Sequence, residues 1–271
     1  MLKRRTIRVE CIGDSFERGY TFGRFSDQVS VNDRLWQIAS PSLAANLLMS
    51  TNNLPVRFRG GNQGFPISRL TDAGLPAALA AYCATWNMDA RDWMLLEDAG
   101  DHIGNPDTYQ AAVEAVIDAV APVRCAVITA FDYPVGIGAD PNYQWDRIIP
   151  GFGRSMNAAK IAAAASRGAL LIDENAAMDA YRSTTLATDL LDPMQHIDGT
   201  IDGIHAGPWG TLKEVSVRLT ALGLAGSVRS IEALTSIANV DFTRLQCGAT
   251  VWNGTRAISY CSALFPAAEV P

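Results

Sequence analysis

Short apolar runs rich in valine and isoleucine alternate along this chain with longer stretches of helical periodicity. The strand-like runs lie at residues 6–13, 55–60, 92–98, 124–131 and 168–174. The helical stretches lie at residues 33–50, 74–86, 107–120, 155–166 and 211–224. Such alternation is typical of a parallel sheet covered by helices, because a chain returns to the next parallel strand only through a crossover connection. The sequence therefore predicts an α/β fold, a three-layer α/β/α sandwich around a five-stranded parallel sheet.

The helical pattern is clearest at residues 107–120. Apolar residues recur there at spacings of three and four, at Ala112, Val113, Val116, Ile117 and Val120. That spacing lines one face of a helix, which is expected to pack on the sheet. In open parallel sheets ligands bind outside the carboxyl ends of the strands, so we expect the functional residues directly after the strand-like runs.

The pattern changes after Ala225. A short helical stretch at residues 230–238 precedes residues 248–261, where Asn253-Gly254 separates two alternating β-type runs. Asn-Gly between such runs indicates a β-hairpin, because both central residues of its turn need a positive φ. We therefore expect two parts, an α/β domain over residues 1–226 and a C-terminal helix and β-hairpin extension over residues 227–271.

The charge and hydropathy of the chain limit what it can bind. It has 271 residues, 48% of them hydrophobic, and a formal net charge of −6. This content supports a sizeable core, whereas the acidic balance argues against a nucleic-acid partner, because phosphate-binding surfaces carry a basic excess. The sequence shows neither the apolar segment of a secretory signal nor the run of about 20 apolar residues that a membrane helix needs. We therefore expect no membrane partner, and a location in the cytoplasm or within a virion or another complex.

The cysteines are scattered, at Cys11, Cys83, Cys125, Cys247 and Cys261. They include no CxxC pair, so the sequence predicts neither a zinc site nor a disulfide framework. We interpret them as small buried apolar residues, with a Cys247–Cys261 bridge as the alternative for the last two.

The tripeptide Gly13-Asp14-Ser15 follows the first strand-like run directly. A serine on a tight strand-to-helix turn can point its Oγ over the edge of the sheet and donate its own N–H to an oxyanion. A turn serine with no catalytic role is the alternative reading of this tripeptide alone.

A second motif lies near the other end of the α/β pattern. Asp202 stands three residues before His205, in a glycine-rich stretch that leads into residues 211–224. A carboxylate at this spacing can accept from Nδ1 of the imidazole and leave Nε2 free to take a proton from a serine. Of the 3 histidines, His102 follows the third strand-like run, and His196 has no acid at this spacing. An exposed loop histidine is the alternative reading of His205.

Together the two motifs resemble those of the SGNH, or GDSL-type, hydrolase family, over about residues 6–225. The resemblance implies that Ser15 is the nucleophile, His205 the general base and Asp202 the residue that orients the imidazole. It also implies that the N–H groups of Ser15 and of Gly64, in "RFRGGNQGFPISRL", form the oxyanion hole. The implied fold is a flavodoxin-like α/β/α sandwich, and neither a cofactor nor a metal is implied.

A further family motif, which we call the third block, differs in this chain from the pattern of the family members. Members carry Gly-x-Asn-Asp after the third strand, where the asparagine is an oxyanion donor, whereas this chain reads Asp98-Ala99-Gly100-Asp101. Gly100 stands at the asparagine position, so its backbone N–H is our candidate for the third donor. Asn62, His102 and Asn105 are the other candidates. Loss of one such donor costs roughly 10²–10³ in rate in a serine hydrolase.

Two further stretches could have a function in binding or specificity. Glu97, Asp98, Asp101 and His102 could ligate a cation, but consecutive residues at a strand end point in different directions, which favours no metal. Residues 136–155 form a long glycine- and proline-rich stretch, a candidate lid or specificity loop.

The motifs thus predict a serine-dependent carboxylic ester hydrolase that cleaves a short acyl group, with an acetylated glycan as the specific expectation. The alternative hypothesis is an inactive SGNH-like module for binding or assembly, for example in a virion tail or a surface complex. In that case the C-terminal hairpin is expected to dock onto a protein partner or onto a second copy of the chain.

Overall fold

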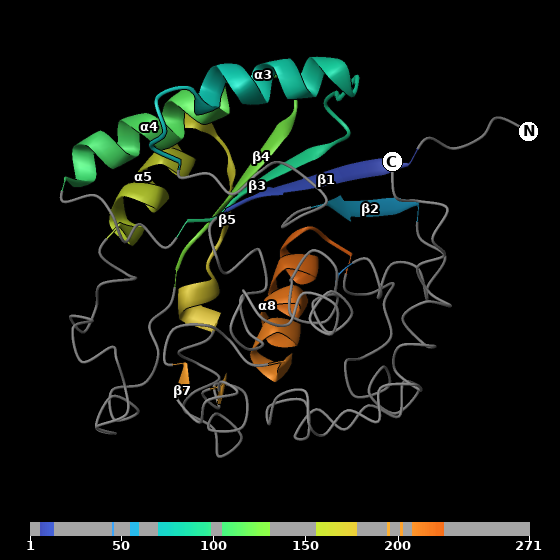
Figure 1. Cartoon of the computed structure of the whole chain (residues 1–271), viewed down its shortest axis with the longest axis vertical. Coiled ribbons are helices and arrows are strands. Elements are labelled where there is room, and N and C mark those ends of the chain that lie inside the picture. Colours follow the sequence, from blue (N-terminus) through green and yellow to red (C-terminus); the bar gives the residue numbers. More distant parts are fainter. Residues whose placement is uncertain are drawn as a thin grey trace, which may run out of the picture. The chain divides into compact units, whose positions relative to one another are not determined.

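The computed structural model describes residues 6–13, 45, 55–59, 70–98, 105–130, 156–177, 194–195, 201–202 and 208–224 (Figure 1). The chain divides into two compact units. The first, which we call the sheet unit, comprises Met1–Arg18, Pro55–Asp132 and Ile148–Ser183. The second unit comprises Gly19–Leu54, Tyr133–Arg147 and Thr184–Pro271.

The sheet unit is built on five parallel strands. They are β1 (Ile7–Ile12), β2 (Val56–Arg59), β3 (Trp93–Leu96), β4 (Arg124–Ile128) and β5 (Leu170–Ile172). Their order across the sheet is β2-β1-β3-β4-β5, and every neighbouring pair is parallel. Each strand lies within one of the five runs predicted from the sequence, so the predicted parallel sheet is confirmed.

The register of the central strands explains why their sequences read as continuous apolar runs. Ile12 lies beside Leu96, and Leu96 beside Val127, so these side chains share one face of the sheet. Leu95 and its neighbour Ala126 project from the opposite face and are also fully buried. Because both faces of these strands are buried, both sets of alternating residues are apolar.

Three helices cover one face of this sheet, as Figure 1 shows: α3 (Leu75–Thr85), α4 (Pro106–Ala119) and α5 (Asn157–Arg167). Of the face predicted for residues 107–120, Val113 and Val116 on α4 and Val120 at its C-cap are buried in the core beneath the helices. Ala112 and Ile117 are only half-buried. The helix begins where the Asn105 Oδ1 accepts from the backbone N–H groups of Asp107 and Thr108, at 2.9 and 3.3 Å. Such a cap satisfies amides that have no partner within the helix.

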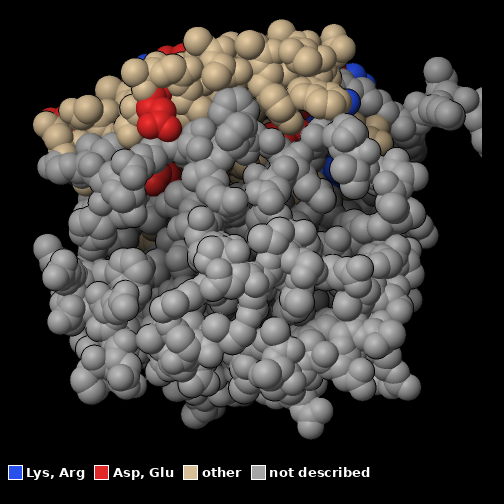
Figure 2. Space-filling view, in the orientation of Figure 1, with Lys and Arg blue, Asp and Glu red and all other residues tan. Residues whose placement is uncertain are grey.

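The outer surface of this helix layer carries few charges (Figure 2). The exposed positions of α3 are mostly alanines, which favour the helix and add little apolar surface. Among the described residues the exposed large hydrophobic side chain is Ile161. The surface of α3 is thus uncharged without presenting large apolar side chains to water, whereas α4 and α5 carry an exposed ion pair between Asp118 and Arg167.

The connections at the two ends of the strands differ in length. Residues 86–92, 120–123 and 168–169 lead from the helices into the amino ends of β3, β4 and β5. Residues 60–74, 97–105 and 129–156 lead from the carboxyl ends of β2, β3 and β4 into the next helix. The amino ends are therefore joined by short turns, and the carboxyl ends by longer segments.

The second unit includes helix α8 (Pro208–Ala221) and the strands β6 (Met194–Gln195) and β7 (Ile201–Asp202), which pair antiparallel. Helix α8 begins three residues before the predicted stretch of residues 211–224. Residue 45 is helical and buried, as expected for residues 33–50, whose other members lie outside the described residues. The predicted boundary at residue 226, helix 230–238 and hairpin 248–261 also lie outside the described residues. None of the helices in the described ranges is long and apolar enough to cross a membrane.

Candidate active site

The strand order places a topological switch between β1 and β3. From β1 the chain continues to β2 on one side, and it later crosses to β3 on the other side. In parallel sheets of this order, ligands bind in the crevice outside the carboxyl ends of the strands at the switch. Gly13, which precedes Asp14 and Ser15 in the sequence, follows β1 directly and is buried. Glu97 and Asp98 follow β3 in the same way, so Gly13 and Asp98 follow adjacent strands of the sheet.

A backbone hydrogen bond keeps β1 and β3 together up to the point where both strands stop. The Glu97 N–H donates to the Ile12 carbonyl over 2.8 Å. The chain therefore leaves the two strands at the same level.

Asp98 connects three parts of the sheet unit. One of its carboxylate oxygens accepts from the Leu70 N–H over 3.1 Å, and its backbone carbonyl accepts from the Lys160 Nζ. Asp98 is 2% exposed and Lys160 is 0% exposed. Leu70 directly follows residues 60–69, which include Gly64, and Lys160 lies on α5. The end of β3 is thus tied to Leu70, which follows residues 60–69, and to helix α5 of the covering layer.

A second polar cluster joins the carboxyl ends of β4 and β5. The Thr129 hydroxyl donates to the Asp173 Oδ1 over 2.9 Å and accepts from the Asn175 N–H over 3.0 Å. The same Asp173 oxygen accepts from the Ala176 N–H over 3.0 Å, at the start of the helical turn of residues 174–177. This turn is therefore capped by an aspartate, and that aspartate is fixed to β4.

Asn157 joins the two ends of the segment between β4 and α5. Its Oδ1 accepts from the Ala130 N–H over 2.9 Å, and its Nδ2 donates to the Ala130 carbonyl over 2.6 Å. The side-chain amide thus pairs with a backbone group in the way that a neighbouring strand would. Residues 131–155, which include the predicted lid, leave and re-enter the described fold beside this pair.

The structure describes the strand ends that precede the predicted catalytic residues. Ser15, Gly64, Gly100 and His205 themselves lie outside the described residues. Asp202 is the last residue of β7, where it pairs with Met194 in the second unit. The triad and the oxyanion hole therefore stay predictions.

Among the other donors considered, Asn105 is described, whereas Asn62 and His102 are not. Asn105 is exposed and caps α4 through its Oδ1. We therefore assign it a structural role.

Sequence reasoning missed Lys160 as a residue of this region. In an alanine-rich helix it reads as an ordinary surface lysine. The signal that could have found it is its helical phase, because Lys160 lies on the face of α5 that buries Ala159, Ala163 and Ala164. A lysine in that phase is either buried or at the edge of a core.

The described cysteines are structural. Cys11, Cys83 and Cys125 are buried, as expected. Burial, together with the negative charges of Glu10 and Asp92, raises the pKa of Cys83 to about 11. Burial, and to a lesser extent Cys83, raises the pKa of Cys125 to about 12. Because the thiolate is the reactive form, these raised pKa values disfavour a nucleophilic role for either thiol at neutral pH.

Within the described ranges, no three histidine, cysteine, aspartate or glutamate residues cluster in a way that could hold a metal ion. In the acidic stretch singled out in the sequence, Glu97 and Asp98 are described and both are buried. Asp101 and His102 lie outside the described residues.

Comparison with known proteins gives matches in structure. No family model matches the sequence, and no curated protein matches it. The structure of a lipase/acylhydrolase from Enterococcus faecalis aligns with a TM-score of 0.50 at 16% identity, over 82% of this chain and 97% of that chain.

Two further structures align over similar lengths. A protein described as a GDSL-like lipase, from Parabacteroides merdae, aligns with a TM-score of 0.49 at 14% identity, over 81% of this chain and 97% of that chain. An acetylxylan esterase from Geobacillus stearothermophilus aligns with a TM-score of 0.47 at 18% identity, over 85% of this chain and 100% of that chain.

The match to the Enterococcus protein extends over nearly the whole of that chain. The parallel sheet that we describe has the strand order that the flavodoxin-like prediction requires. The chain therefore shares its α/β fold, with a five-stranded parallel sheet, with that lipase/acylhydrolase.

Proposed function

We propose that this protein is a serine hydrolase of carboxylic esters, with Ser15 as its nucleophile. The observation that carries the proposal is the position of Gly13 in the fold, because Asp14 and Ser15 follow it directly in the sequence. The tripeptide begins where β1 ends, at the switch point of the sheet, beside the end of β3. That is the place where parallel α/β sheets bind their ligands.

The proposed reaction follows the Ser-His-Asp scheme. The Ser15 Oγ bonds to the carbonyl carbon of the ester as His205 takes its proton, and Asp202 holds the imidazole in the required tautomer. The tetrahedral intermediate collapses when the C–O bond to the alcohol breaks, and His205 returns the proton to that oxygen. Water then adds to the acyl group with His205 as base, which releases the acid and restores Ser15.

The negative charge of the tetrahedral intermediate needs donors that already point at it. We propose the backbone N–H groups of Ser15 and Gly64 as two of these donors and that of Gly100 as the third. The proposal gives the third role to a backbone amide because a glycine stands where family members carry an asparagine.

The proposed substrate is a short acyl ester, with an acetyl group on a carbohydrate as the specific case. Support for acyl ester chemistry comes from the two motifs and from the fold, which the Enterococcus lipase/acylhydrolase shares. A panel of p-nitrophenyl esters of increasing acyl length, followed by acetylated xylooligosaccharides, tests both parts of this assignment.

The deciding experiment measures p-nitrophenyl acetate turnover by the parent and by Ser15→Ala. We expect the substitution to lower kcat at least about 10³-fold, because removal of the nucleophile disables the whole triad. Ser166→Ala is the matched control, since Ser166 is exposed near the end of α5, and it is expected to keep full turnover. A fluorophosphonate should label the parent and the control at Ser15, as read by mass spectrometry of the peptides.

The proposal fails if the parent is no faster than Ser15→Ala and the fluorophosphonate does not label Ser15. That outcome would support the binding or assembly module instead.

A further inference from the structure

We infer that Lys160 is a positioning residue for the proposed oxyanion hole, an inference that rests on the proposed esterase function. Its buried ammonium holds the end of β3 at the carbonyl of Asp98, from which the third-block segment continues. The Asp98 carboxylate in turn accepts from the N–H of Leu70, which follows residues 60–69 and Gly64. We call these three residues, Leu70, Asp98 and Lys160, the clasp.

The burial of Lys160 indicates that this ammonium has a specific task. Lys160 is 0% exposed, on a helix face whose other buried side chains are alanines and Asn157. Burial of a charged ammonium is costly unless hydrogen bonds replace its water. An apolar residue would satisfy packing at this position without that cost. The Asp98 carbonyl is a partner that no apolar side chain could hold.

The clasp lies where proposed catalytic segments join the rigid fold. Residues 60–69 lead into Leu70, and residues 99–104 follow Asp98. Residues 131–155 re-enter the fold at the start of α5, the helix that carries Lys160. One buried cation and one buried carboxylate therefore fix the points from which Gly64 and Gly100 depart.

The anchoring at Asp98 matters because this chain carries Gly100 where family members carry the asparagine of the third block. An asparagine brings a side-chain donor to the oxyanion, whereas a glycine has only its backbone N–H and more conformational freedom. The direction of that N–H depends on how the segment is held, and displacements of about 1 Å can cost on the order of 10²-fold in rate. Lys160 fixes the direction of this segment by binding the carbonyl of Asp98, two residues before Gly100.

The test compares Lys160→Met with Asp92→Asn. Methionine has a similar length without the charge. Asp92 is an equally buried polar anchor at the opposite end of the strands. Both substitutions are expected to lower the unfolding temperature. Only Lys160→Met should lower kcat for p-nitrophenyl acetate, by about tenfold to 100-fold, with KM within about threefold of the parent, because the acyl site itself is kept.

Hydrogen exchange supplies a readout that needs no turnover. In Lys160→Met, the Leu70 amide and the amides of residues 97–105 should exchange faster than in the parent, whereas Asp92→Asn should leave them unchanged. If Lys160→Met does not fold, Asp98→Ala takes its place. It removes the acceptor of the Leu70 N–H and keeps the carbonyl for Lys160, so it should raise exchange at Leu70 and lower kcat less.

Two results would overturn the inference. One is unchanged exchange at Leu70 and residues 97–105 in the clasp variants. The other is a kcat loss that is equal in Lys160→Met and Asp92→Asn, since a purely structural lysine would behave in that way. Failure of the proposed function is distinct, because it appears in the parent as turnover that does not depend on Ser15.

Discussion

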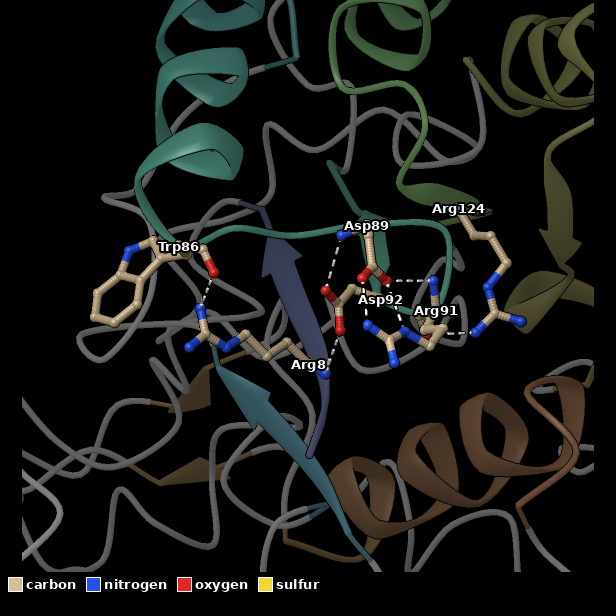
Figure 3. A network of polar contacts seen from close by, with 6 residues as sticks. All are labelled: Arg8, Trp86, Asp89, Arg91, Asp92 and Arg124. Atoms are coloured by element: carbon tan, nitrogen blue, oxygen red, sulfur yellow. Dashed lines mark hydrogen bonds and ion pairs between the residues drawn. The ribbon is translucent and has the colours of Figure 1, made fainter. Parts of the chain in front are cut away.

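The two ends of the parallel sheet use buried charge in different ways. At the amino ends, Asp92 accepts from the backbone N–H groups of Arg8 and Asp89, at 2.9 and 3.0 Å (Figure 3). At the carboxyl ends, Asp98 accepts from Leu70 over 3.1 Å. Both aspartates are buried and both bind backbone amides, yet Asp92 closes a short turn and Asp98 anchors a long segment.

The amino-end cluster joins side chains to the backbone of the turns between helix and strand. Arg8 lies over the ring of Trp86, 4.9 Å from its centroid, and donates to the Trp86 carbonyl over 2.8 Å. Arg124 lies over the ring of Trp93, at 4.1 Å, and donates to the Arg91 carbonyl over 2.6 Å. These arginines cover aromatic faces and satisfy turn carbonyls, which stabilises the short connections between helix and strand.

The carboxyl-end clusters instead bind atoms at the strand ends from which the chain continues into longer segments. Thr129, Asn157 and Lys160 each bind an atom at a strand end from which a longer segment leaves. Ligand-binding groups in α/β proteins lie on such segments, and a rigid base sets their positions. The comparison predicts that damage at the amino end lowers stability alone, whereas damage at the carboxyl end also lowers activity.

The largest effect on stability is expected at the amino end, from Asp92→Ala. The substitution leaves the amides of Arg8 and Asp89 without their acceptor, which should lower the free energy of unfolding by about 3 kcal/mol. Urea unfolding followed by circular dichroism measures this change. Asp107→Ala, at the exposed first turn of α4, is the control and should lose less than about 1 kcal/mol. A fall in kcat per folded molecule of Asp92→Ala would break the comparison.

A smaller loss of stability is expected at the carboxyl end, from Thr129→Val. The Asp173 carboxylate loses a donor and the Asn175 amide loses an acceptor, at a cost of about 1.5 kcal/mol. We also expect kcat for p-nitrophenyl acetate to fall about fivefold, because the turn after β5 is no longer fixed to β4. Thr85→Val is the matched control, since the exposed Thr85 hydroxyl donates only to Ala81 of its own helix. An unchanged kcat in Thr129→Val would make this cluster purely structural.

The smallest expected effect is a loss of stability at alkaline pH. It tests the electrostatic contribution of the buried charges at the amino end. The folded pKa of Cys83 is about 11, against 9.0 without these surroundings. Below pH 9 the thiol is protonated in both states, so its contribution to stability is fully present. Between about pH 9 and 11 the unfolded chain releases this proton and the folded chain keeps it, so the free energy of unfolding falls.

Urea unfolding of the parent and of Cys83→Ala at pH 8, 9, 10 and 11 measures this contribution. The parent should lose about 1 kcal/mol more than the variant over this range, within the limit that one proton sets. Equal losses in the two proteins would mean that Cys83 makes no contribution.

Much of the fold could be predicted from local sequence. The runs that became β1 to β5 are short and apolar, and the phase of Val113, Val116 and Val120 placed the buried face of α4 correctly. The motifs at Ser15 and at Asp202 and His205 could be found because their spacing reflects chemistry within a few residues. Their meeting in one site stays a prediction.

The clasp could not have been predicted in this way. Lys160 and Asp98 are separated by 62 positions, and Leu70 and Asp98 by 28. Nothing in the neighbouring residues of any of the three marks it as a partner of the others.

The sequence alone determined the strands, the helices and the candidate nucleophile, because periodicity and motif spacing are properties of adjacent residues. The tertiary structure decided which strand ends are neighbours, which buried charges meet there and which segments they hold. Those contacts depend on the crossover from β2 past β1 to β3 and on the register of the whole sheet. Both arise only when distant parts of the chain pack together.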